Sequence, residues 1–583
     1  MDERGDDPKL AAEGELAMAR LALDDDEYDH AAKHLAGAVG YAPGLPEVHE
    51  ALAELLRRCG PRVLDLFPVD GDLYIGAVVA RAHQAAALGQ PAEALSLLVS
   101  ATRHEPGMPW AAVPWVEAPD LPGRVDPEVL LRTFVGLAGA LPDPVPEPDR
   151  PALGPYLVLA RHAVRGYGQD GPLLGAASAV GRRLGAFDEA VGWAEQAVAV
   201  APSMMTEIWL GYAYRAANRP DDAIGAWRRA LEHDPMNLSI YADVANLLAD
   251  MGRMDDAIAW AEQALQIDPD YDCAVHTAQS LRFRLDGDVD HLVALADFMR
   301  EHPQESHEHT DLEQACRELD WLGVVATPSE ASTNVLDQLL QEDTSMAGAS
   351  MAITDLEPPS AITLMQRMFP GLTVHFDTVS EPDLRRPLAQ VGIQLWTYDG
   401  TDARPAVPAP SAAAVDRIHE VISYRLGHPA AAYDRAITLS DLPVEDFLGL
   451  LVRPPEPPEG PFRRYPAIWA KCVQAWACLG ILHHRPDEPW PTSARRRILA
   501  DIAYGVEDWT TEVALYGLIV AAWVDPAART DVRDLVAGRF HAADQAYERR
   551  PVTIIRSLAS LALATPQMHA PLRDRARALL AEV

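Results

Sequence analysis

The feature that most constrains this chain is a proline that recurs at a nearly constant interval. Pro202, Pro235, Pro269 and Pro303 follow one another at spacings of 33, 34 and 34 residues. A fixed period near 34 residues indicates an array of helical hairpins, each of which buries its apolar face by stacking on its neighbours. Proline suits the end of each block, because it lacks an N–H and clashes with the preceding helical turn. We therefore expect residues 171–325 to form a helical array.

Small and apolar residues recur inside each block where two antiparallel helices would touch. Between Met204 and Pro235, the first half offers Gly211, where two helix backbones can approach closely. The second half carries an apolar stripe with helical spacing, formed by Ala223, Ile224, Trp227, Ala230 and Leu231. The blocks 171–202 and 238–269 keep this pattern, whereas the block 272–303 keeps mainly its length.

This pattern resembles the tetratricopeptide repeat family over residues of about 12–106 and 171–303. The resemblance implies a right-handed α-solenoid in which the first helix of each hairpin lines a concave groove. That groove binds extended peptides or helices in the family, so the resemblance also implies a protein-binding scaffold. We expect residues 1–106 to form N-terminal repeats and residues 107–170 to form an irregular, proline-rich helical connection.

The periodicity changes between residues 345 and 400. The segments 372–379 and 393–398 alternate apolar and polar residues as β-strands do. An earlier strand is predicted at 351–354 and a helix at 362–369. We therefore expect residues 345–400 to form a small α/β module.

A second period governs the last region, where Pro486, Pro526 and Pro566 lie 40 residues apart. Each proline follows an apolar helix and precedes a second helix that contains arginine. The predicted pairs are 465–484 with 493–504, 510–524 with 531–540, and 552–564 with 571–580. This period resembles HEAT-type repeats, which implies a helical HEAT-like domain over 411–583. The predicted fold is therefore mostly α, with two helical arrays flanking a small α/β module.

The chain is strongly acidic, since 49 Lys and Arg against 86 Asp and Glu give a net charge of −37. Binding to nucleic acid or to anionic membranes relies on Lys and Arg, so we expect neither. No signal-peptide pattern and no apolar run long enough to cross a membrane is visible, and the five cysteines are scattered. We expect a cytoplasmic protein without membrane insertion, and its charge would attract a basic partner.

The candidate partner-binding residues come from aligning the blocks on the family's groove-lining helices. Asn246 falls where the family often has an asparagine that binds a peptide backbone. The arginines could hold a carboxylate through paired, charge-assisted hydrogen bonds, or they could simply pair with neighbouring acids. Met205 and Tyr212 would add apolar anchoring surface, whereas Trp209 is expected to pack between repeats. The set comprises Arg182, Arg183, Met205, Tyr212, Arg215, Asn246, His276 and Arg284.

Metal and catalytic sites are weighed against simpler structural roles. Asp355, Asp377 and Asp399 each end a predicted strand, where carboxylates could hold Mg²⁺, but Asp is also common in turns. His302, His307 and His309 are expected in a solvated loop, and His30 and His34 lack a third ligand. No nucleophile elbow, kinase motif or dinucleotide fingerprint appears. We expect no cofactor, no metal and no catalytic residues.

The sequence therefore predicts a protein-interaction scaffold that binds a partner polypeptide, rather than an enzyme. Two alternatives remain open. The module at 345–400 could be a metal- or nucleotide-dependent catalytic unit to which the repeats bring a substrate. Alternatively, the chain could be an acidic regulator that sequesters a basic protein.

Overall fold

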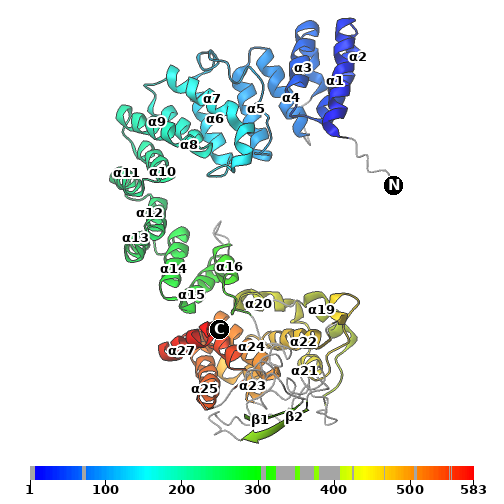
Figure 1. The fold of residues 1–583 in the computed structure, drawn as a ribbon, viewed down its shortest axis with the longest axis vertical. Coiled ribbons are helices and arrows are strands. Elements are labelled where there is room, and N and C mark those ends of the chain that lie inside the picture. Colours follow the sequence, from blue (N-terminus) through cyan, green and yellow to red (C-terminus); the bar gives the residue numbers. More distant parts are fainter. Residues whose placement is uncertain are drawn as a thin grey trace. The chain divides into compact units, whose positions relative to one another are not determined.

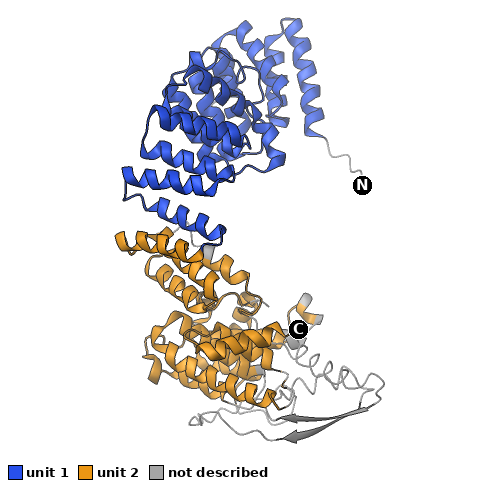
Figure 2. Ribbon diagram, turned by 60° about the vertical axis from the view of Figure 1, so that its left-hand side comes forward, with its two compact units in different colours: residues 1–253 blue, residues 254–583 orange. Residues whose placement is uncertain are grey.

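The computed structural model describes residues 7–67, 74–303, 310–323, 348–354, 373–379, 407–422, 426–464, 466–504, 509–549, 552 and 554–582. This part of the chain is mostly helical, as the sequence predicts, and it forms two compact units (Figure 2). Unit 1 comprises residues 1–253 and unit 2 comprises residues 254–583. None of the described helices is both long and apolar enough to cross a membrane.

Unit 1 is built from helices whose sequence neighbours pack against one another, with α1 on α2, α4 on α5, α8 on α9 and α10 on α11 (Figure 1). Proline at the first turn begins several of them, where its missing N–H costs no helical hydrogen bond. The elements are α1 Pro8–Asp24, α2 Tyr28–Tyr41, α3 Pro46–Cys59, η1 Pro61–Leu66, α4 Ile75–Ala87, α5 Pro91–His104, η2 Pro122–Arg124, α6 Pro127–Ala140, η3 Glu147–Asp149, α7 Arg150–Gly166, α8 Gly171–Arg183, α9 Phe187–Val200, α10 Met204–Ala216, α11 Pro220–His233 and α12 Leu238–Asp250.

The turns between the two helices of a hairpin share one backbone feature. Gly185, Asn218 and Gly252 follow the first helix of successive blocks, and all three have positive φ, at 82°, 56° and 78°. Glycine and asparagine reach this left-handed region at lower cost than other residues. The 34-residue period therefore repeats residues suited to positive φ in the turns, as well as apolar residues on the helix faces.

Residues 107–170 contain two full helices, α6 and α7, as well as irregular segments. Phe134 of α6 and Tyr156 of α7 are fully buried, and they share one hydrophobic core with α5 and α8. The Tyr156 hydroxyl lies 2.8 Å from the Thr102 hydroxyl of α5. This proline-rich segment is thus packed into unit 1 as a structural part of the array.

Unit 2 contains a large hydrophobic core that includes Trp469, Trp476, Trp490 and Trp523. α24 contacts both α22 and α26, and each of these three is followed by a second helix. The helices are α13 Met254–Ile267, α14 Asp272–Asp286, α15 Val289–Glu301, α16 Thr310–Arg317, α19 Ala412–Val421, α20 Pro429–Ala436, η4 Ile437–Leu439, α21 Val444–Val452, η5 Pro461–Arg464, α22 Pro466–Ile481, η6 Trp490–Thr492, α23 Ala494–Ala503, α24 Trp509–Val524, η7 Pro526–Ala528, α25 Arg529–Tyr547, α26 Ile555–Ala564 and α27 Ala570–Ala581.

The region 345–400 contributes two described strands, β1 Gly348–Thr354 and β2 Thr373–Val379. They pair in parallel, with Ala352 opposite Asp377. Both strands were predicted, at 351–354 and 372–379. The helix expected at 362–369 and the strand expected at 393–398 lie outside the described residues.

Candidate functional site

Three successive first helices of unit 1, α8, α10 and α12, carry most of the predicted partner-binding residues. Arg182 and Arg183 end α8, Tyr212 and Arg215 lie in the second half of α10, and Asn246 lies on α12. α8 and α10 pack directly against each other. Alignment of the repeats thus places these side chains on consecutive first helices.

Tyr212 is the centre of the arrangement, because guanidinium groups lie over its ring. The carbon at the centre of the Arg182 guanidinium is 5.1 Å from the ring centroid, and that of Arg215 is 5.0 Å away. The tyrosine hydroxyl donates a 2.5 Å hydrogen bond to Oδ2 of Asp243 on α12. Trp227 of α11 packs edge-on against the ring, with centroids 5.3 Å apart. Cation–π attraction between the two guanidinium groups and the face of the Tyr212 ring favours a fixed position of that ring.

Two carboxylates complete what we call the arginine–tyrosine network, defined as Asp143, Arg182, Arg183, Tyr212, Arg215 and Asp243. Arg182 forms an ion pair with Asp143, and Nη2 of Arg183 lies 3.9 Å from the same carboxylate. Nη1 of Arg215 lies 3.8 Å from Oδ1 of Asp243. The three guanidinium groups therefore face two carboxylates, which leaves one positive charge in excess.

Burial shapes the ionisation of this network. It lowers the pKa of Arg182 and of Arg183, and the Asp143 carboxylate opposes that change in both. Burial also raises the pKa of Tyr212, and the adjacent Asp243 carboxylate raises it further. The pKa of Asp243 is raised by burial, although the Tyr212 hydrogen bond and Arg215 act against the rise.

The prediction missed both carboxylates. Asp243 lies one helical turn before Asn246, so the same alignment of blocks could have placed it on this face. Asp143 comes from the proline-rich segment between α6 and α7, which has no repeat pattern. No sequence signal connects it with Arg182, 39 residues later.

The other predicted residues differ in exposure. Met205 is 44% exposed at the start of α10, and Asn246 is exposed on α12. In unit 2, Arg284 is exposed on α14. His276 is fully buried on α14, with Nε2 3.3 Å from Oδ1 of Asp272. The His276 side chain therefore packs inside the protein and has no surface to offer a partner.

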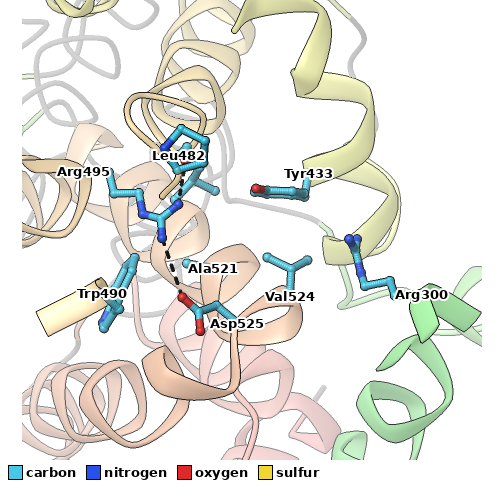
Figure 3. A pocket seen from close by; sticks show the side chains of 9 residues that line it. Arg300, Tyr433, Leu482, Trp490, Arg495, Ala521, Val524 and Asp525 are labelled. Carbon is cyan, nitrogen blue, oxygen red and sulfur yellow. Dashed lines mark hydrogen bonds and ion pairs between the residues drawn. The ribbon is translucent and has the colours of Figure 1, made fainter. Parts of the chain in front are cut away.

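Unit 2 contains a cavity of about 230 Å³ between α15, α20, α23 and α24 (Figure 3). Arg495 lies 3.6 Å from Asp525, and its guanidinium is 5.8 Å from the Trp490 ring. On the other side, Arg300 donates a 2.9 Å hydrogen bond to Asp434. Because each guanidinium has its own carboxylate, the cavity has balanced charges. Its lining consists of Arg300, Tyr433, Leu482, Pro486, Trp490, Arg495, Ala521, Val524 and Asp525.

The residues considered for metal or catalytic chemistry are not assembled into a site by the described part of the structure. Asp377 lies inside β2, with Thr378 and Val379 following it in the strand, whereas Asp355 and Asp399 lie outside the described residues. His302 stacks on Phe298, with ring centroids 4.4 Å apart, and His307 and His309 also lie outside the described residues. No group of three or more His, Cys, Asp or Glu that could hold a metal ion is found among described residues.

The chain is similar to several solved structures. One is YrrB, described as a TPR protein with an unusual peptide-binding site, at 15% identity over 38% of this chain and 98% of that chain, with a TM-score of 0.25. Another is a thermophilic TPR protein from Thermus thermophilus, at 21% identity over 38% and 99%, with a TM-score of 0.22. A third is MamA from Desulfovibrio magneticus RS-1, at 18% identity over 34% and 97%, with a TM-score of 0.22.

A family model described as tetratricopeptide repeat matches residues 210–272. A search of curated proteins found no match to the chain. The match covers the blocks with the most regular small-residue pattern, which form α10 to α13 in the structure. Residues 210–272 therefore match the tetratricopeptide repeat family, within the segment where the sequence resembles it.

Proposed function

We propose that unit 1 of this helical repeat scaffold binds an acidic segment of a partner polypeptide at the arginine–tyrosine network. The excess of one guanidinium over the carboxylates of the network carries the proposal. A carboxylate from outside would balance that charge with paired hydrogen bonds, which arginine forms better than lysine does.

The exposure of individual groups supports a role for Arg215 as the direct contact. Its side chain is 38% exposed, whereas that of Arg182 is 6% exposed. The buried Arg182 therefore holds the Tyr212 ring in place, and Arg215 is the guanidinium that an incoming carboxylate can reach. Met205 and Asn246, both exposed on neighbouring first helices, offer an apolar contact and a backbone-binding amide.

A peptide-binding measurement on the full chain tests this proposal. Fluorescence anisotropy would compare members of an acidic peptide library with counterparts in which every Asp and Glu is replaced by Asn and Gln. We expect preferential binding of acidic peptides, and Arg215→Ala to weaken it roughly tenfold, because a charge-assisted hydrogen bond contributes about 1.5–3 kcal/mol.

The matched control is Arg228→Ala, which removes an exposed arginine from α11, the second helix of the same hairpin. It makes the same change in net charge, so it should leave the affinity unchanged. Equal losses in both variants would mean that general charge attracts the peptides. Equal binding of the acidic and amide libraries would refute the proposal.

The C-terminal array forms the other half of the proposed scaffold. We propose that α22 to α27 are three HEAT-like hairpins, which is supported by the contacts of α24 with both α22 and α26. Cryo-electron microscopy of the full chain with a bound partner would show whether both arrays contact it.

A further inference from the structure

Two histidines on α2 face each other at the N-terminal end of unit 1. His30 and His34 are one helical turn apart, and their Nε2 atoms are 3.0 Å from each other. Each ring also contacts a carboxylate through its other nitrogen. Nδ1 of His30 lies 3.1 Å from Oε2 of Glu27, and Nδ1 of His34 lies 2.6 Å from Oε2 of Glu15 on α1.

These contacts determine where the ring protons lie. An ionised carboxylate only accepts hydrogen bonds, so each Nδ1 carries the N–H that donates to its glutamate. In the neutral rings, both Nε2 atoms then present lone pairs. Two lone pairs 3.0 Å apart repel each other unless a positive charge lies between them. That charge is either a shared proton or a metal ion.

The geometry matches what a transition-metal ion requires. Two ring nitrogens about 2.0–2.1 Å from one ion, at right angles to each other, lie roughly 2.9 Å apart. Right-angled ligand pairs belong to the tetragonal coordination of Cu²⁺ or Ni²⁺. Histidines that bind metals also commonly donate their second N–H to a carboxylate, which fixes the ring and increases its basicity.

The surroundings leave room for an ion and favour its charge. Gly37 lies one turn after His34, and a Cβ there would come within 3.3 Å of the Glu15 carboxyl carbon. Glycine at this position therefore gives the Glu15 carboxylate space beside α2. The His34 side chain is 22% exposed and that of His30 is 51% exposed, so a hydrated ion can enter. The acidic run at 24–27 adds negative charge nearby.

We propose that His30 and His34 bind a divalent transition-metal ion, Cu²⁺ or Ni²⁺, through their Nε2 atoms. Glu27 and Glu15 hold the two rings by their Nδ1 atoms, and water fills the remaining coordination positions. A two-histidine site completed by water does not need a third protein ligand.

Calorimetric titration of the full, metal-free chain with CuCl₂ in a non-chelating buffer tests the proposal. We expect one site that loses at least tenfold in affinity in His34→Gln. Glu15→Gln should lose roughly tenfold, which is the usual size of a hydrogen-bonded partner's effect on a metal-bound histidine. His104→Gln removes an exposed histidine from α5 and should change nothing.

Electron paramagnetic resonance of the Cu²⁺-loaded chain provides a second, independent measurement. A tetragonal spectrum with coupling to two nitrogens is expected for the wild type, and it should be lost in His30→Gln. The proposal would be overturned if the His30→Gln, His34→Gln double variant bound Cu²⁺ as tightly as the wild type does, or if the wild type bound no Cu²⁺ at all. In the second case a shared proton alone would join the rings. Circular dichroism confirms that each variant is folded.

Discussion

The 34-residue hairpins of unit 1 and the 40-residue hairpins of unit 2 are joined by different physical means. In unit 1, the indole of Trp209 on α10 covers Gly175 of the preceding block, and the indole of Trp227 covers Gly211 within its hairpin. In unit 2, the indole N–H of Trp523 donates a 2.9 Å hydrogen bond to the Ala564 carbonyl, 41 residues later. Tryptophan therefore joins helices of unit 1 by packing against glycine, whereas Trp523 joins helices of unit 2 through a hydrogen bond.

Ion pairs also connect neighbouring hairpins of unit 2. Arg496 of α23 binds Asp531 of α25 through two hydrogen bonds of 2.7 Å, and the Trp490 indole donates to the same carboxylate at 3.1 Å. Arg575 of α27 binds Asp544 of α25 at 2.8 Å. Close packing of indoles on glycine therefore distinguishes the shorter period, whereas arginine–aspartate pairs connect neighbouring hairpins in both arrays, as Arg215 of α10 and Asp243 of α12 do in unit 1.

The largest effect should come from filling the space against a buried indole. Gly211→Val places new atoms inside the ring of Trp227, which is fully buried and has no room to turn. We expect a loss of about 3 kcal/mol in the free energy of unfolding, the upper end of typical overpacking costs. Urea denaturation followed by hydrogen exchange in α10 and α11 measures it.

Gly192→Val is the matched control, because a side chain at this exposed position of α9 meets nothing within 4 Å. Its effect should stay within about 0.5 kcal/mol. If both variants lost the same free energy of unfolding, the low helix propensity of valine, and not a clash with the Trp227 indole, would explain the loss in Gly211→Val.

Acid should weaken unit 1 near α3 and α4, where two neutral histidines are buried. Burial lowers the pKa of His49 to about 4, and it lowers the pKa of His83 well below its ordinary value. Between pH 6.5 and the lowered pKa, the unfolded chain binds protons that the folded chain rejects, so stability falls as the pH falls. From pH 6.5 to pH 5, His49 alone should cost about 2 kcal/mol.

Hydrogen exchange of α3 and α4 at pH 7 and pH 5, corrected for intrinsic rates, measures this loss. His49→Asn should flatten the pH dependence. The exposed His104→Gln should leave it unaltered. Equal protection of both helices at the two pH values in the wild-type chain would contradict the assignment of neutral buried rings.

Removing a carboxylate that joins two hairpins should destabilise unit 2 by a smaller amount. Asp531→Ala breaks the Arg496 pair and leaves the indole N–H of the buried Trp490 without that acceptor. We expect a loss of about 1–2 kcal/mol, since the carboxylate is partly exposed. Asp534→Ala, which removes a partner of the adjacent Arg533, should cost less than about 0.5 kcal/mol. Thermal unfolding of the two variants provides the comparison.

The smallest effect concerns the turn that the 34-residue period repeats. Asn218 has a φ of 56°, where the neighbouring blocks have Gly185 and Gly252. Asn218→Gly should therefore be neutral or stabilising by up to about 0.5 kcal/mol, whereas Asn218→Ala should lose about 1 kcal/mol. Differential scanning calorimetry would compare the changes in melting temperature of the two variants. If Asn218→Ala raised the melting temperature, the backbone at this turn would not be strained.

Local patterns predicted the helices well, because helix formation depends on nearby residues. The segment expected at 510–524 forms α24 Trp509–Val524, and the one expected at 493–504 forms α23 Ala494–Ala503. The segment expected at 531–540 forms the longer α25 Arg529–Tyr547. Its later residues include Ala542, Ala543 and Ala546, which are buried, so packing extends the helix beyond the predicted end.

The sequence by itself determined the mostly helical fold, its two periods and the first helices on which the arginines lie, because each depends on spacing along the chain. Only the tertiary structure decided the partners of those side chains. Asp143 and Asp243 meet Arg182 and Tyr212 across 39 and 31 residues. Likewise, a carboxylate on α1 orients the His34 ring across 19 residues. Contacts between separate helices depend on how the helices pack, and a pattern with a period of one hairpin does not contain that information.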